Sequence, residues 1–474
     1  MNRSRSAALA LVVFAGALAP SAALAQSTQS FEIRQSLRAG RAHVPEQLLV
    51  QFRADVDDAS QTQLLGRINA QRVEALVRRA NRQDRKGDLI LIKIPRGQSV
   101  ADAMTVLETD SRVEFAEPNW VYTKQQVANP NDQLNFNLWG MMGSTTSPSN
   151  AFGSGALAAW NAGKKCDPAV HIGVIDEGIM TSHTDLRANI WVNAGDSSVD
   201  GIDNDGNRYI DDTNGWDFAG RNRTVYDGTS DDHGTHVAGT IAATANNATG
   251  VWGVCPTAKL ISAKFLGSTG GTTADAILAV DYITNLKTSK TLRIVATNNS
   301  WGGGGFSKGL YDAISRANSA DILFIAAAGN DSLNIDATAS FPAAYGNPPT
   351  TYGVAPLPNV IAVAAIASTG ALATFSNYGA TTVHLGAPGV GIYSTVPGRK
   401  NASSYASYNG TSMATPHVAG AAALYASLNP CAKAAQIKSA ILSNAVPTAS
   451  LTAKTITGGR LDVSKFQNET TCGN

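Results

Sequence analysis

The sequence predicts an α/β protein in which helices flank a parallel sheet, preceded by a small α+β domain. Two observations support this. From about residue 126 the chain is rich in Gly, Ala, Ser and Asn, and near-continuous apolar runs alternate with helical stretches. Such runs are typical of parallel strands that are buried on both faces. Before that, residues 44–125 form a shorter unit that is richer in Arg and Gln.

The first 25 residues are typical of a secretory signal peptide. Arg3 and Arg5 precede an apolar run over 7–19, and Ala23-Leu24-Ala25 is a small-x-small cleavage signal. The run is too short to span a membrane, although an N-terminal anchor is the alternative. We therefore expect a secreted protein, extracellular or periplasmic, with no membrane contact. Residues 26–43 are polar, lack periodicity and are predicted to be a linker.

The expected elements follow the apolar patterns. In the small unit we expect strands at 48–52 and 89–94, helices at 61–68 and 99–109, and a last extended segment at 113–122. In the large unit we expect strands at 170–175, 259–264, 294–297, 322–327 and 360–364, and helices at 235–245, 274–286, 309–319 and 414–427. In such folds, functional residues gather at the carboxyl ends of the strands. The composition becomes polar around 124–132, which marks a boundary and a possible processing site.

Charge and cysteines limit the classes of function. Lys and Arg number 37 against 36 Asp and Glu, and no nucleic-acid-binding motif is present, so we expect no nucleic-acid partner. We also expect a monomer. The four cysteines allow three disulfide pairings. We favour Cys431–Cys472, which would tie the C-terminal tail to a helix start, and this leaves Cys166–Cys255. Free buried thiols are the alternative.

Ser412 is the first candidate for catalysis. It follows a glycine turn at Gly410 and begins a run of small apolar residues that predicts a buried helix. A serine hydroxyl is a poor nucleophile unless a neighbouring base takes its proton. The chain should therefore also supply a histidine, a carboxylate that orients it, and a donor for the developing oxyanion.

Candidates for these roles lie upstream. Asp176 ends an apolar strand before a glycine turn, although an Asp in that place is often structural. His233 opens a predicted helix. His236 lies three residues further on, so a metal-binding pair is the alternative, but no Glu stands between them as in a zinc-hydrolase helix. We interpret His236 and His417 as structural. Asn330 follows another strand and could donate its amide to an oxyanion, or simply serve as a turn residue.

The chain order Asp, His, Ser is that of the subtilisin triad, and the Ser412 segment is no GxSxG elbow. Here the chain resembles the subtilisin-like serine proteases, closely from about 129 to 463. The resemblance implies a subtilisin-like fold, with Asp176, His233 and Ser412 as the triad. It also implies an oxyanion hole made by Asn330 and the backbone N–H of Ser412.

The same resemblance implies how peptides and the N-terminal unit bind. Two edges would clamp the substrate strand: Ser300, Trp301 and Gly302 on one side, and Gly270 and Gly271 on the other. Residues 44–125 would be a ferredoxin-like inhibitory propeptide, whose last strand lies in the cleft, and 126–474 the peptidase domain. The expected function is a secreted serine endopeptidase that processes its own precursor between about 122 and 130.

One residue departs from the family pattern. The family usually has Ser or Thr after the triad aspartate, where its hydroxyl can bond the carboxylate. This chain has Glu177, which cannot donate a hydrogen bond when ionised. We therefore expect the local hydrogen bonding of Asp176 to differ.

Calcium is the expected cofactor. The loop 200–212 carries oxygen ligands at alternating positions, partly like an EF-hand loop, and a solvated acidic loop is the alternative. The resemblance implies a second calcium site, with carbonyls near 245, 249 and 251. The candidate ligands in the first site are Asp203, Asp205, Asn207, Asp211 and the Tyr209 carbonyl, and in the second Asp132, Asp185 and Asn247.

Two other functions compete with the endopeptidase. One is a catalytically inactive subtilisin-like binding module, which the presence of all four catalytic residues disfavours. The other is an esterase or lipase, which the missing GxSxG motif and the different triad order disfavour.

Overall fold

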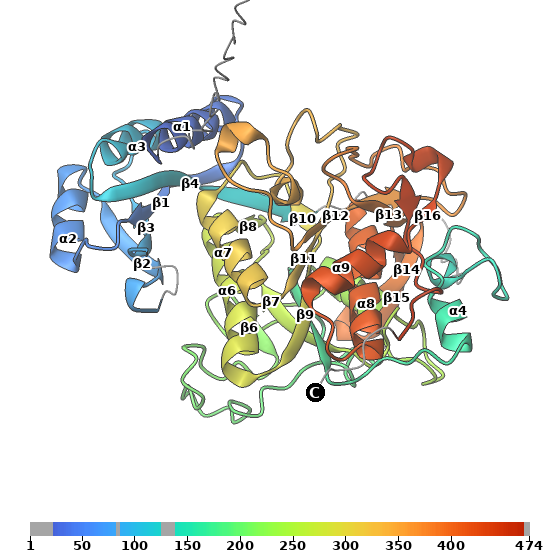
Figure 1. The fold of residues 1–474 in the computed structure, drawn as a ribbon. Helices are drawn as coiled ribbons and strands as arrows, with labels where there is room; N and C mark the ends of the chain where they lie inside the picture. Colours follow the sequence, from blue (N-terminus) through green and yellow to red (C-terminus); the bar gives the residue numbers. More distant parts are fainter. Residues whose placement is uncertain (1–21, 82–85, 125–137, 469–474) are drawn as a thin grey trace, which may run out of the picture.

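The structure is a computed structural model that describes residues 22–81, 86–124 and 138–468. Figure 1 shows a small N-terminal domain, blue to cyan, beside a larger domain, green to red. The chain passes from one domain to the other through residues 125–137, which lie outside the described part. The processing region predicted at 122–130 therefore lies mostly outside it too.

The large domain is built on a nine-stranded sheet, in the order β16-β17-β13-β12-β11-β9-β5-β7-β6. From β17 to β6 the neighbouring strands run parallel, and only β16 pairs antiparallel, at one edge. The strands are β5 (Val170–Asp176), β6 (Gly215–Asp217), β7 (Lys259–Lys264), β9 (Arg293–Asn299), β11 (Leu323–Ala327), β12 (Val360–Ile366), β13 (Leu385–Pro388), β16 (Val446–Pro447) and β17 (Gly459–Arg460). All residues of β5, β11 and β12 are buried, which explains their continuous apolar sequences.

Helices cover both faces of this sheet. Neighbouring residues of β7 show the two faces, since Leu260 packs in the core with α4, α5, α8 and α9, and Ile261 in the core with α6 and α7. The helices are α4 (Ala156–Asn161), α5 (Asp232–Ala242), α6 (Thr273–Lys290), α7 (Lys308–Ser319), α8 (Thr411–Leu428) and α9 (Ala434–Ser443). The predicted α/β class is thus confirmed. The hairpin of β14 (Ile392–Pro397) with β15 (Ser403–Tyr408) was not predicted, and of α9 only a helix start near Cys431 was expected.

The small domain is an antiparallel sheet with helices. Its strands are β1 (His43–Phe52), β2 (Gln71–Val77), β3 (Leu89–Lys93) and β4 (Val113–Lys124), in the order β4-β1-β3-β2, and its helices include α2 (Asp58–Arg67) and α3 (Val100–Glu108). The predicted elements are present, and β2 is the strand that the sequence pattern did not reveal. The expected α+β architecture is confirmed.

The predicted linker at 26–43 is wrong, because helix α1 spans Ala22–Arg38. Its Ile33 is only 2 % exposed, and Arg34 forms an ion pair with Glu108 of α3 at 2.8 Å. The helix also contacts β4 and the short helix Thr350–Tyr352 of the large domain. Polar residues hide its helical period, so contacts with the rest of the protein, rather than an amphipathic pattern, hold it.

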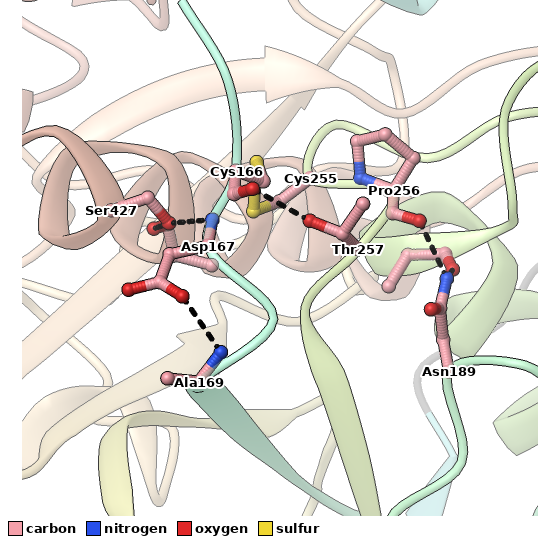
Figure 2. The surroundings of a disulfide bond; sticks show 10 residues. Cys166, Asp167, Ala169, Asn189, Cys255, Pro256, Thr257 and Ser427 are labelled. Carbon is pink, nitrogen blue, oxygen red and sulfur yellow. Dashed lines mark hydrogen bonds between the residues drawn. A yellow bond between two sulfur atoms is a disulfide. The ribbon is translucent and has the colours of Figure 1, made fainter.

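A disulfide anchors the start of β5. Cys166 is bonded to Cys255, with 5.5 Å between their Cα atoms, which confirms one of the two expected bridges. Figure 2 shows its surroundings, where Asp167 N–H donates to Ser427 Oγ at 2.9 Å and Thr257 Oγ1 donates to the carbonyl of Cys166 at 2.8 Å. The bridge thus ties together the segments that lead into β5 and β7. The other expected pairing involves Cys472, which lies outside the described residues.

None of the described helices combines the length and the apolar character that crossing a bilayer requires. The predicted signal peptide falls largely on residues 1–21, outside the described part.

Candidate active site

Asp176 and His233 form a buried hydrogen-bonded pair. Asp176 is the last residue of β5 and His233 lies in the first turn of α5, and the side chains of both are 0 % exposed. His233 Nδ1 and Asp176 Oδ1 are 2.8 Å apart. An ionised carboxylate only accepts hydrogen bonds, so this contact places the histidine proton on Nδ1 and leaves Nε2 as the acceptor nitrogen of a neutral ring.

The two oxygens of the Asp176 carboxylate differ in their partners. Its Oδ1 also accepts the backbone N–H of Glu177, at 2.8 Å, whereas its buried Oδ2 has no hydrogen-bond partner among the described residues. The carboxylate of Glu177 turns away and accepts the backbone N–H of His233. The local hydrogen bonding thus differs as expected, because the side chain of Glu177 bonds the helix of His233. Residue 177 therefore connects the strand end that carries Asp176 to the helix that carries His233.

Ser412 lies at the start of α8, as the sequence predicted. Gly410 precedes the helix with φ +153°, a conformation that glycine adopts readily. Ser412 Oγ donates to the carbonyl of Ser300 at 2.9 Å, and Ser300 Oγ donates to the carbonyl of Ser412 at 2.9 Å. This reciprocal pair fixes Ser412 to the segment after β9, and α8 also packs against α5, the helix that carries His233.

Asn330 follows β11 and presents an oriented amide beside α8. Its Oδ1 accepts from both the backbone N–H and the hydroxyl of Thr411, at 2.9 and 3.0 Å. Its buried Nδ2 has no hydrogen-bond partner among the described residues. Because the oxygen is held, the Nδ2 donor is left for another acceptor. The role of Thr411 was missed, because a residue next to Ser412 gives no separate signal in the sequence.

Strand β4 of the small domain runs between the two predicted substrate edges of the large domain (Figure 1). On one side Thr123 pairs antiparallel with Gly302 of β10 (Trp301–Gly302). On the other side Tyr122 pairs antiparallel with Gly271 of β8 (Gly271–Thr272). The end of β4 thus forms the middle strand of a three-stranded arrangement, in the manner of a bound extended peptide.

The glycines of these edges leave room for the inserted strand. A Cβ at Gly304 would lie 2.4 Å from the ring of Tyr122, and one at Gly270 would lie 2.7 Å from its carbonyl oxygen. Tyr122 is fully buried and packs edge-on against Trp301, with ring centroids 5.0 Å apart. The space between the two edges is therefore large enough for an aromatic ring.

Comparison with known proteins identifies the family. A sequence model described as the subtilase family, Peptidase_S8, matches residues 167–467, which is well over half of the chain. The chain belongs to the subtilase family. A second model, the fervidolysin N-terminal prodomain, matches residues 32–119, so the small domain of this subtilase is similar to a known prodomain.

Individual relatives agree with this assignment. An extracellular protease of Xanthomonas campestris is 34% identical over 374 residues, which are 75% of this chain and 59% of that protein. Subtilisin DY of Bacillus licheniformis is 39% identical over 278 residues, 58% of this chain and 83% of that protein. The crystal structure of fervidolysin from Fervidobacterium pennivorans has a TM-score of 0.63 at 22% identity, covering 89% of this chain and 61% of that one, and shows the shared fold.

The prodomain of this subtilase also reaches the surfaces of two helices. Glu117 of β4 is buried and accepts from Ser307 Oγ at 2.7 Å and from the backbone N–H groups of Lys308 and Gly309 at 2.7 and 3.1 Å, at the start of α7. Asn119 accepts the N–H of Ala274 in the first turn of α6 at 3.0 Å. Burial raises the pKa of Glu117 to about 7. The sequence did not indicate these partners of Glu117 and Asn119.

The other two noted histidines are structural, as predicted. His236 Nε2 contacts the carbonyl of Ile392 at 2.9 Å and its ring stacks on Tyr408, with centroids 4.5 Å apart. His417 Nδ1 contacts the carbonyl of Met413 at 2.8 Å. Burial lowers the pKa of His236 to about 3 and that of His417 to about 4, so both rings are neutral near pH 7. His233 and His236 have different partners and do not form a metal-binding pair.

The acidic loop gathers a different set of residues from the one predicted. Among the described residues, the carboxylates of Asp196, Asp205 and Asp212 approach one another within 4.8 Å. Only Asp205 belongs to the predicted set. Asp203 accepts the backbone N–H groups of 207 and 208, and Asp211 those of 200 and 201, so both carboxylates serve the turns of the loop. Asn207 points its Nδ2 at Asp212, at 2.9 Å.

The second predicted calcium set is described only in part. Asp185 and Asn247 do lie together, with Asn247 Nδ2 donating to Asp185 Oδ1 at 2.7 Å. The other oxygen of Asp185 accepts from Val251 N–H and from the hydroxyl of Tyr405, both at 2.9 Å. Asp132 lies outside the described residues. Both oxygens of Asp185 are therefore already engaged by hydrogen-bond donors of the protein.

Proposed function

We propose that this subtilase is a secreted serine endopeptidase that hydrolyses peptide bonds with Asp176, His233 and Ser412. The observation that carries the proposal is the fully buried hydrogen bond between Asp176 and His233, at the start of a helix that packs against the helix of Ser412. The chain spans 59% of the Xanthomonas relative, so the activity is argued from its own residues. An inactive binding module would not need a buried, oriented imidazole.

The proposed reaction begins at Ser412. Its Oγ leaves the carbonyl of Ser300, gives its proton to His233 Nε2 and attacks the peptide carbonyl carbon. Asp176 holds the imidazole in the Nδ1–H tautomer and stabilises the imidazolium that forms. His233 then passes the proton to the leaving amine, and a water molecule releases the acyl group from Ser412 by the same route.

Asn330 and the backbone N–H of Ser412 are the proposed donors to the oxyanion. The hydrogen bonds from Thr411 support this role, because they hold the amide oxygen and leave the buried Asn330 Nδ2 as a pre-oriented donor. Pre-oriented donors of this kind act at the point where negative charge develops. Ser300, Trp301, Gly302, Gly270 and Gly271 are the proposed edges of the substrate strand.

Extended peptides are the proposed substrates and the prodomain is the proposed intramolecular inhibitor. The pairing of β4 with β8 and β10 supports both ideas, since β4 lies between the two proposed edges as an extended strand. An esterase would need no such edges. We further propose that the chain cuts itself at or just beyond the end of β4, between about 122 and 130.

Secretion is part of the proposal. The signal-like N-terminus and the disulfide Cys166–Cys255 both support an oxidising compartment outside the cytosol. The Xanthomonas relative is named an extracellular protease. We expect a monomer with no nucleic-acid or membrane partner.

Calcium fits one of the two expected places. Asp196 is 1 % exposed and its Oδ2 has no hydrogen-bond partner among the described residues, which leaves a buried anionic oxygen beside Asp205 and Asp212. Burial raises the pKa of Asp212 to about 6, and among the described residues the one ion pair of these three carboxylates is that of Asp205 with Lys290. We propose that Asp196, Asp205 and Asp212 bind a structural Ca²⁺, which would neutralise this loop.

The test uses casein and Ser412→Ala. We expect the wild-type chain to mature and to hydrolyse casein, and a serine-directed phosphonylating inhibitor to block it. Ser412→Ala should stay an unprocessed precursor, with turnover about 10⁶-fold lower, the scale found on removing the subtilisin serine. Processing of purified Ser412→Ala at the wild-type rate would refute self-cleavage, and casein hydrolysis by it would refute the triad.

A further inference from the structure

Helix α5, which carries His233, is not capped by its own N-cap residue. Asp231 occupies that position but its side chain makes no hydrogen bond to the helix. Instead Asp231 Oδ1 accepts from Lys264 Nζ at 2.9 Å and Oδ2 accepts from Asp227 N–H at 2.6 Å. The first N–H groups of a helix have no partner within the helix, so they need an acceptor from elsewhere.

Glu177 supplies that acceptor from the end of β5. Its side chain is nearly buried, at 5 % exposed, and its Oε1 accepts the backbone N–H of His233. The turn is pressed against the helix, because a Cβ at Gly234 would lie 2.1 Å from the carbonyl oxygen of Gly178. Lys264 Nζ also donates to the backbone carbonyl of Glu177 and so fixes the turn from its other side.

We propose that Glu177 is a positioning residue for His233, which holds the histidine backbone against Asp176 and adds negative charge beside the imidazole. This inference rests on the proposed function, in which His233 is the base. It gives a reason for the departure at position 177. A hydroxyl there would serve Asp176, whereas the carboxylate serves the helix that delivers the histidine.

Other charged and titratable groups face this place and do not replace Glu177. Asp231 is paired with Lys264, and Asp232 accepts the hydroxyl of Tyr408. Asp227 lies 3.5 Å from Lys264. The remaining groups on the packed elements are Asp176, which bonds His233, and His236, whose pKa is lowered by burial. Among these, the described hydrogen bond to the N–H of His233 comes from Glu177.

Glu177 supplies an acceptor and a negative charge, and two variants separate these two effects. Glu177→Ala removes both the acceptor and the charge, so His233 is less well held and turnover should fall about 10-fold to 10²-fold with KM little changed. Glu177→Gln keeps an acceptor oxygen but removes the charge. At about 6 Å and an effective dielectric constant of about 40–80, one unit charge shifts a proton equilibrium by about 0.5–1 pH unit.

The experiment measures kcat and KM against pH for the mature enzyme, with active sites counted by the phosphonylating inhibitor. Negative charge favours the imidazolium, so its loss should move the acid limb of the kcat profile to lower pH by about 0.5–1 unit in both variants. Turnover at the plateau should be largely restored in Glu177→Gln. The matched control is Asp167→Asn, which also removes one negative charge. Asp167 precedes the first residue of β5, at the end of the strand away from Asp176, so this variant should leave the acid limb in place.

A second readout does not depend on turnover. The NMR signal of the His233 Nδ1 proton should change at a lower pH in Glu177→Gln than in wild type, by the same 0.5–1 unit. An unchanged acid limb and NMR titration in Glu177→Gln would overturn the proposal, as would a loss in Glu177→Ala confined to KM. Failure of the proposed function would look different, as a wild-type chain that neither cleaves peptides nor reacts at Ser412.

Discussion

The prodomain should inhibit more strongly at low pH, and Glu117 should be the reason. This carboxyl lies at the start of α7, where it accepts from one hydroxyl and two backbone N–H groups and is fully screened from water. Burial raises its pKa from 4.5 to about 7. In the free prodomain, where the side chain meets water, the ordinary value should apply.

This shift in pKa sets the direction in which inhibition changes with pH. A raised pKa means that the bound state favours the protonated carboxyl. The contribution of Glu117 to the affinity of the prodomain is therefore fully present below pH 4.5 and is lost as pH rises towards 7. The two values differ by about 2.5 units, 7 − 4.5, which corresponds to an affinity change of about 300-fold at most. Between pH 5 and pH 8 we expect the inhibition constant to rise by about 10²-fold.

The assay titrates mature enzyme with prodomain, residues 26–124, between pH 5 and 8, following a peptide substrate. Glu117→Gln keeps an oxygen acceptor but cannot ionise, so it should inhibit with little dependence on pH. Asn119→Ala is the matched control, since it removes the neighbouring contact to α6, at 3.0 Å, without changing a titratable group. It should weaken inhibition by about the same factor at every pH, roughly 10-fold.

Two results would refute this reasoning. One is a Glu117→Gln prodomain whose inhibition still weakens by about 10²-fold from pH 5 to 8, because the pH dependence would then belong to another group. The other is a wild-type prodomain whose inhibition strengthens as pH rises, because binding would then lower the pKa of this carboxyl instead of raising it.

Three other predictions follow from the described contacts. Asn330→Ala should lower kcat by about 10²–10³-fold with little change in KM. A rise in KM with kcat unchanged would contradict its role at the oxyanion. Cys255→Ser opens a bridge that closes 89 residues and should lower the free energy of unfolding by about 2–5 kcal/mol, measured by denaturant titration with wild type under reducing conditions as the control. Chelation should lower the melting temperature of wild type by several degrees, since an ion at 100 times its Kd contributes about 2.7 kcal/mol. Asp196→Asn should remove most of that response, and a melting temperature that ignores the chelator would contradict the calcium site.

The sequence was most informative where local pattern and tertiary environment agree. The continuous apolar runs predicted β5, β7, β11 and β12 because both faces of a central parallel strand are buried. The small-residue run after Ser412 predicted α8, which lies in the core. Asp176 and His233 were predicted from their places at a strand end and a helix start, and the structure brings them into contact.

Features held by distant partners could not be predicted. The polar sequence of α1 shows no helical stripe, and the helix depends on contacts such as that between Arg34 and Glu108. The acidic cluster combines Asp196, Asp205 and Asp212 across sixteen positions, whereas a local ligand pattern pointed to neighbouring alternate residues. Likewise, the sequence showed that Glu177 cannot donate to Asp176, but not that its carboxylate reaches the N–H of His233.

The same limit applies to the contacts between the domains. Nothing in the sequence near Glu117 indicates that its partners lie some 190 residues later, at the start of α7. Arg41, in the segment expected to be a linker, donates to the carbonyl of Gly303, at 3.1 Å, next to the substrate edge. These contacts form only where the two domains meet, so a residue pattern within either domain does not contain them.

The most direct test of the central claim is to locate the adduct of a serine-directed phosphonylating inhibitor by mass spectrometry. The account predicts one adduct per mature chain, on Ser412, and its loss both in His233→Ala and after denaturation. An adduct on another residue, or labelling that survives in His233→Ala at the wild-type rate, would contradict it.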